Sequence, residues 1–211
     1  MNRKFRNIMM FIYVLSLAVM LAGATFAYFT YIKVSSVSPI VEAQTATVGN
    51  IIFNINNSID ILVNGKNFAK GMPSISSESS ASATLIVNGE KEYKTKYNLY
   101  LEIEENPFIY TSLDNTPEII MSIIDPLGNE VTEIDGLSYS SVTDGTGKLI
   151  KGFDITTKTQ RVNIANAYEI KTMNETTQIW KVQITFVNLE TDQAENTPKE
   201  FDGYLKMEKV V

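Results

Sequence analysis

A strict two-residue alternation of apolar and polar side chains is the feature that most constrains the fold of this chain. In the stretch QIWKVQITFV (178–187), one face carries Trp180, Val182, Ile184 and Phe186. A β-strand points successive side chains to opposite sides, so this pattern predicts a half-buried antiparallel strand. The same alternation runs through TKYNLYLEIEE (95–105), ASATLIVNG (81–89) and GYLKMEKV (203–210).

Shorter apolar segments extend the strand pattern over the rest of the chain. The segment EIIMSII (118–124) is apolar on both faces, which is typical of a strand buried in a sandwich core. Weaker strands are expected at 46–55, 59–63, 147–153 and 160–170. Turn residues punctuate them at Asn56-Asn57-Ser58, Asn64-Gly65, Asn88-Gly89, Gly128-Asn129 and Asp144-Gly145. Asn88-Gly89 is typical of a hairpin turn.

Together these segments predict an all-β fold, an antiparallel and jelly-roll-like β-sandwich over residues 46–211. Within it, the serine-rich stretch SISSESSASA (74–83) is expected to be an exposed loop that leads into a strand. The stretch SVTDGTGK (141–148) lacks the full glycine pattern of a phosphate-binding loop, so a hairpin turn is expected there.

The N-terminal segment has the layout of a secretory signal peptide. Basic residues come first, an apolar run follows, and small residues close it at Ala22, Ala24, Thr25 and Ala27. We expect residues 1–28 to be removed by a signal peptidase, with plausible cuts after Ala24 or Ala27. The alternative is a permanent membrane anchor, because residues 8–32 carry no charge and a spanning helix needs roughly 20 residues. The expected location is therefore extracellular or cell-surface, or alternatively single-pass membrane-anchored.

The segment GATFAYFT (23–30) resembles the end of the signal peptides that SipW-type peptidases of Gram-positive bacteria remove. The substrates of these peptidases are the TasA/camelysin-like secreted β-sandwich proteins, and the resemblance puts the mature start near Tyr28 or Phe29. Tyr31 departs from the family pattern, in which an acidic residue often stands there. The stretch ATVGNIIFNI (46–55) resembles the first mature strand of the family, and residues 180–208 resemble its closing hairpin.

The resemblance implies that the protein assembles into fibres by donating an N-terminal strand to a neighbour's sheet, which is β-strand addition. The candidate donor is FTYIKVSSVSPIV (29–41), whose apolar residues include Phe29, Ile32, Val34 and Val41. Pro39 limits how far this segment could pair. The alternative is that residues 29–45 form a plain extended linker.

Composition excludes several classes of function. The chain has no cysteine and no histidine, so it has no disulfide, no Ser-His-Asp triad and no HExxH zinc site. Zinc proteolysis, which has been associated with the camelysin branch, is therefore not carried over. After the first 28 residues the chain has 15 basic and 24 acidic groups, and an acidic body is a poor partner for nucleic acid.

Two groups of acidic residues could in principle bind Ca²⁺, which prefers carboxylate and carbonyl oxygens. They are Glu102, Glu104 and Glu105 at a strand end, and Glu190, Asp192 and Glu195 in an expected hairpin loop. Exposed, solvated carboxylates explain both groups more simply, and no spacing selects a glycosidase pair. No metal, cofactor or catalytic residue is therefore expected.

These patterns favour a non-enzymatic structural protein of the cell surface or biofilm matrix that associates with itself. A second hypothesis is a membrane-anchored β-domain that binds a protein or ligand. A third is a secreted hydrolase that uses carboxylates or a Ser-Lys pair.

Overall fold

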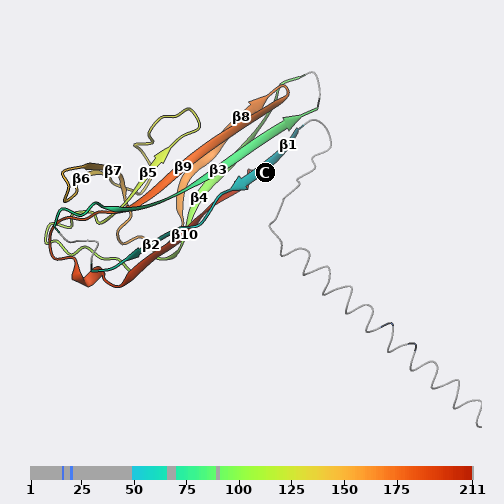
Figure 1. Ribbon diagram of the computed structural model, residues 1–211. Coiled ribbons are helices and arrows are strands. Elements are labelled where there is room, and N and C mark those ends of the chain that lie inside the picture. Colours follow the sequence, from blue (N-terminus) through green and yellow to red (C-terminus); the bar gives the residue numbers. More distant parts are fainter. Residues whose placement is uncertain (1–15, 17–19, 21–48, 66–69, 89–90, 211) are drawn as a thin grey trace, which may run out of the picture. The chain divides into compact units, whose positions relative to one another are not determined.

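The computed structural model describes Ser16, Met20 and residues 49–65, 70–88 and 91–210 (Figure 1). The chain contains two compact units, Met1–Val41 and Glu42–Val211, and of the first only Ser16 and Met20 are described, both as helical. All of the linker or donor strand predicted at 29–45, and all of the signal peptide or anchor predicted at 1–28 except Ser16 and Met20, thus lie outside the described residues. No helix in the described ranges is long and apolar enough to cross a membrane.

The described part of the second unit is built from ten strands in two antiparallel sheets, which confirms the predicted all-β, sandwich-like class. The strands are β1 Gly49–Ile55, β2 Ile59–Val63, β3 Ile75–Val87, β4 Tyr93–Glu105, β5 Ile119–Ile124, β6 Tyr139–Thr143, β7 Leu149–Asp154, β8 Val162–Thr172, β9 Glu175–Phe186 and β10 Lys199–Lys209. One sheet has the order β1-β3-β9-β5-β7-β6 and the other the order β2-β10-β4-β8. A short 3₁₀ helix, Ala194–Asn196, precedes β10.

The alternating strands place their apolar faces in one core between the two sheets. Trp180, Val182, Ile184 and Phe186 of β9 are all buried, as the alternation predicts. Strand β5 lies between β9 and β7 and buries both faces. Its Met121 joins the main core, whereas Ile120 packs in a smaller cluster on the other side of the sheet. The continuous apolar run at 118–124 reflects this burial on two sides.

Tyr97 of β4 joins the two sheets in the middle of the core. Its ring is fully buried and lies 5.8 Å from the ring of Tyr168 and 5.9 Å from the ring of Phe53. Burial raises the pKa of the Tyr97 hydroxyl well above its usual range. The hydroxyl donates a hydrogen bond to Gln178 Oε1 at 2.8 Å, so its polar atom is satisfied inside the core.

The prediction of an exposed loop at 74–83 is wrong, because nearly all of this stretch belongs to β3. Strand β3 pairs with β1 on one side and with β9 on the other. Its inward serines are satisfied locally: Ser79 Oγ donates to the Asn57 carbonyl at 2.7 Å, and Asp60 N donates to Ser77 Oγ at 3.3 Å. Pairing on both edges overrides the weak strand propensity of serine.

Two predicted hairpins are also wrong. The connection at Asn88-Gly89 joins β3 to β4, and the connection at 187–198 joins β9 to β10, yet each of these pairs is divided between the two sheets. A turn signal shows only that the chain reverses, whereas a hairpin also needs its two strands to pair with each other. The hairpin predicted at 141–148 is confirmed, because β6 and β7 pair directly around it. Strand β6 itself was not expected.

Candidate functional site

The six-stranded sheet ends in an open edge at β1. Strand β1 pairs with β3, and no strand of the described residues pairs with its other side. Asn56 N donates to the Ser80 carbonyl at 2.9 Å, at the register position next to the Ile55–Ala81 pair. Antiparallel pairs alternate between hydrogen-bonded and non-hydrogen-bonded positions. The backbone N–H and C=O groups of Ile51, Phe53 and Ile55 therefore point away from β3, towards an additional strand.

The sequence of β1 does not protect this edge. Natural edge strands usually carry a charge or a proline that discourages pairing with another chain. Strand β1, GNIIFNI, has neither over seven residues. The edges of the four-stranded sheet do carry charge, with Asp60 on β2 and Glu169 and Lys171 on β8. The remaining edge, β6, is uncharged but has only five residues.

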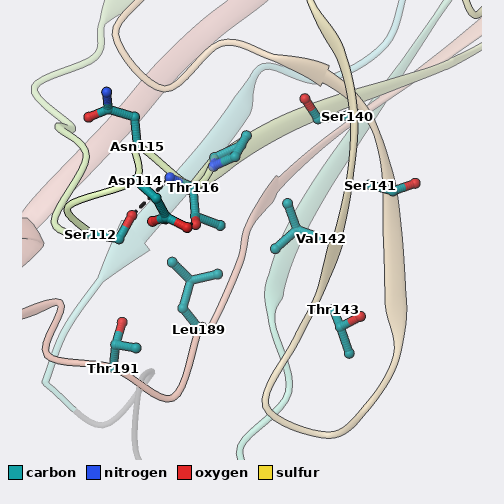
Figure 2. Close-up of a pocket in the computed structure, with 11 residues that line it drawn as sticks. Ser112, Asp114, Asn115, Thr116, Ser140, Ser141, Val142, Thr143, Leu189 and Thr191 are labelled. Atoms are coloured by element: carbon teal, nitrogen blue, oxygen red, sulfur yellow. Dashed lines mark hydrogen bonds between the residues drawn. The ribbon is translucent and has the colours of Figure 1, made fainter.

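A groove of about 670 Å³ lies beside β6 (Figure 2). The groove is lined by Ser112, Asp114, Asn115, Thr116, Pro117, Ser140, Ser141, Val142, Thr143, Leu189 and Thr191. Hydroxyl groups dominate its walls, and Val142 and Leu189 contribute apolar surface between them. Hydrogen bonds from Thr116 and Ser112 hold the pKa of the Asp114 carboxyl below its usual value. Asp114 is the only carboxylate among these lining residues, and none of them is a lysine, so the groove offers no carboxylate pair and no Ser-Lys dyad.

A buried carboxylate fastens the loops next to this groove. Glu118 has no exposed surface, and its Oε1 accepts hydrogen bonds from the Thr111 backbone N at 2.6 Å and from Thr111 Oγ1 at 2.7 Å. Its Oε2 accepts from Gln193 Nε2 at 2.8 Å and from Asn196 Nδ2 at 2.7 Å. All four partner atoms are donors, so both carboxylate oxygens of Glu118 are satisfied as acceptors. Glu118 thereby ties the loop between β9 and β10 to the segment that leads into β5.

Asn196 extends this network to the base of β10. Its Oδ1 accepts from the Ile109 backbone N at 3.1 Å and from Lys199 Nζ at 3.0 Å, and its Nδ2 also donates to the Ile109 carbonyl at 2.7 Å. Asn196 has no exposed surface. A fully satisfied buried polar network of this kind specifies one loop conformation.

Asp144 organises the turn between β6 and β7. Its Oδ1 accepts from Thr146 N at 2.9 Å, from Thr146 Oγ1 at 2.7 Å and from Lys148 N at 3.0 Å. Its Oδ2 accepts from Ser74 Oγ at 2.9 Å, which links the turn to the chain entering β3. Burial alone would raise the pKa of Asp144, but the hydrogen bonds from Thr146 and Ser74 outweigh it and bring the pKa far below its usual value.

The structure separates the acidic residues that the sequence grouped. Glu102 forms an ion pair with Arg161, while Glu104 and Glu105 are exposed. In the predicted loop, Glu190 Oε1 accepts from Gly71 N at 2.8 Å and Asp192 Oδ1 accepts from Ala194 N at 3.0 Å. Within the described ranges, no group of three or more acidic residues is arranged to hold a metal ion.

The structure contains one acidic pair that the sequence analysis did not predict. Asp60 of β2 and Asp202 of β10 stand directly opposite each other on neighbouring strands. Burial raises the pKa of Asp202, and the neighbouring Asp60 raises it further. Only the register of two strands more than a hundred residues apart could have revealed this pair.

The residues singled out at the N-terminus are not placed by the structure. The proposed signal-peptidase region (Ala22, Ala24, Thr25, Ala27, Tyr28, Phe29) and the donor residues (Ile32, Val34, Val41) lie outside the described residues. The open edge of β1 was not foreseen, because the edge position of a strand depends on its partners and not on its own sequence.

Comparisons with known proteins give no relative for this chain: no family model, no curated protein and no solved structure matches it.

Proposed function

We propose that this chain is a non-catalytic structural protein, secreted or held at the cell surface, that assembles with copies of itself by β-strand addition. The open, uncharged edge of β1 is the observation that carries the proposal. The partner strand is residues 29–41 of a second copy, in which Phe29, Ile32, Val34 and Val41 supply apolar side chains. Main-chain hydrogen bonds to Ile51, Phe53 and Ile55 provide affinity that does not depend on a catalytic site.

Several features support this proposal over an enzyme. The residues that line the groove beside β6 include no carboxylate pair and no Ser-Lys dyad, and the buried carboxylate of Glu118 is fully occupied by donors that hold loops. Consecutive strands β1 to β4, and again β8 to β10, alternate between the two sheets, which is typical of a jelly roll. The resemblance to TasA/camelysin-like proteins of the biofilm matrix rests on the GATFAYFT segment, and a two-sheet β fold is what that resemblance implies.

The first experiment is intact mass and N-terminal sequencing of the protein from cells and from medium. A start between Thr25 and Phe29 supports export and frees residues 29–41. An intact N-terminus found only in membranes overturns release into the medium. It then favours the second candidate, a tethered domain that binds a ligand in the hydroxyl-lined groove beside β6.

The second experiment tests the β1 edge in the released protein by electron microscopy and sedimentation of fibres. Ile55→Pro removes an outward-pointing backbone N–H, whereas Ile55→Ala removes the side chain and keeps the N–H. We expect Ile55→Pro to reduce the sedimented fibre at least about tenfold relative to Ile55→Ala, since each lost ladder bond weakens strand addition. Equal fibre yields from the two variants would rule out β1 as the acceptor edge.

A further inference from the structure

The part of the outer face of the six-stranded sheet that β1, β3, β9 and β5 form carries almost no charge. On β1, β3, β9 and β5, all outward side chains except three are serine, threonine, asparagine, glutamine or isoleucine. The exceptions are Glu78, Glu175 and Lys181. The outer face of the four-stranded sheet is different, because it carries Lys94, Lys96, Glu102, Glu169, Lys171, Glu200, Asp202, Lys206 and Glu208.

The nearly uncharged face is also partly apolar. Short side chains pair along it, with Thr84 Oγ1 and Thr177 Oγ1 2.9 Å apart and Ser76 Oγ and Thr185 Oγ1 2.9 Å apart. Three isoleucines stand among them with substantial exposure: Ile52 at 38%, Ile124 at 36% and Ile179 at 50%. Depletion of charge is what distinguishes the centre of a protein interface from ordinary surface.

Glu78 and Lys181 make this face complementary to itself. In the β3–β9 register Glu78 stands opposite Gln183 and Ser80 opposite Lys181, so Glu78 and Lys181 are diagonal neighbours. Both side chains are exposed, and no ion pair joins them in the part of the chain that the structure describes. A two-fold axis that runs parallel to the face, passes above the midpoint between Glu78 and Lys181 and is perpendicular to the line that connects them places each next to the opposite charge of a second copy.

We infer that this face is a contact between two copies of the chain, related by that two-fold axis. Glu78 of each copy meets Lys181 of the other. Ser80 and Gln183 form the other diagonal of the same four residues, so they lie near the axis and meet their own counterparts in the second copy. The contact goes beyond strand addition at β1, since it joins whole sheets face to face and needs no donor strand.

Charge reversal tests the contact in the full chain, purified in a mild detergent, by sedimentation velocity over a range of concentrations. Glu78→Lys and Lys181→Glu each place like charges across the axis, and we expect each to weaken dimerisation at least about tenfold. The double variant restores opposite charges and should restore the dimer. Lys96→Glu and Glu169→Lys make the same changes on the other outer face and should leave dimerisation unchanged.

A cross-linking experiment gives a second readout, because the chain has no cysteine of its own. A short bismaleimide should trap Gln183→Cys as a dimer, and it should not trap Tyr204→Cys on the opposite face. A monomer at all concentrations, a double variant that fails to recover, or equal cross-linking of the two cysteine variants would each overturn the inference. Ile55→Pro should reduce the sedimented fibre and leave this dimer intact. The failure of one proposal can therefore be told apart from the failure of the other.

Discussion

The indole nitrogen of Trp180 donates a hydrogen bond of 2.9 Å to the hydroxyl of Tyr97, and this bond joins the two sheets inside the core. Trp180 belongs to β9 and Tyr97 to β4, 83 positions apart in the chain.

Tyr97→Phe keeps the ring but leaves the Trp180 N–H without its acceptor. A buried donor left unsatisfied costs about 1–3 kcal/mol. We expect the free energy of unfolding in denaturant to fall by that amount. Tyr204→Phe, at an exposed hydroxyl, is the control and should change it little.

Glu118→Gln should loosen the loops beside the groove. The amide of glutamine would direct N–H groups at partners that are themselves donors, so at least one buried hydrogen bond is lost. We expect a loss of about 1–3 kcal/mol in the free energy of unfolding. Hydrogen exchange should rise in residues 188–198. Glu195→Gln, on an exposed side chain of the same loop, should leave both measurements near the wild-type values.

Asp144 should make the protein sensitive to acid. Its folded pKa lies below the unfolded value of about 3.9, so its contribution to stability is present above that value and is lost as the pH falls below it. Asp144→Asn removes this dependence. We expect the unfolding midpoint of the wild type to drop more steeply than that of Asp144→Asn between about pH 4 and pH 2. Parallel curves for the two proteins would contradict the assignment.

Asp202 should behave in the opposite way. Its folded pKa is raised by burial and by Asp60, so its ionisation opposes folding, and this cost appears as the pH rises above the unfolded value of about 3.9. We expect Asp202→Asn to raise the thermal unfolding midpoint at pH 7 and to have less effect near pH 3. A matched change at the exposed Glu200 should have a smaller effect at both values, and a lower midpoint for Asp202→Asn at pH 7 would count against the pair.

Much of the strand pattern was predictable, because it depends on local alternation. The buried face of β9, the double burial of β5 and the hairpin of β6 and β7 all follow from short stretches. The serine-rich part of β3 was mistaken for a loop, because serine has a low intrinsic strand preference and the decisive contribution is pairing with β1 and β9. Hairpin signals failed at Asn88-Gly89 because they do not specify which strand is the partner.

The sequence by itself determined where most of the strands lie and which of their faces are buried, since side-chain periodicity reports burial directly. It also excluded histidine and cysteine chemistry from composition alone. Tertiary structure alone decided which strands became edges, that no strand of the described residues covers the outer edge of β1, and that Glu118 accepts four hydrogen bonds from Thr111, Gln193 and Asn196. These features arise from contacts between residues far apart in the chain, and no local pattern encodes the register that brings them together.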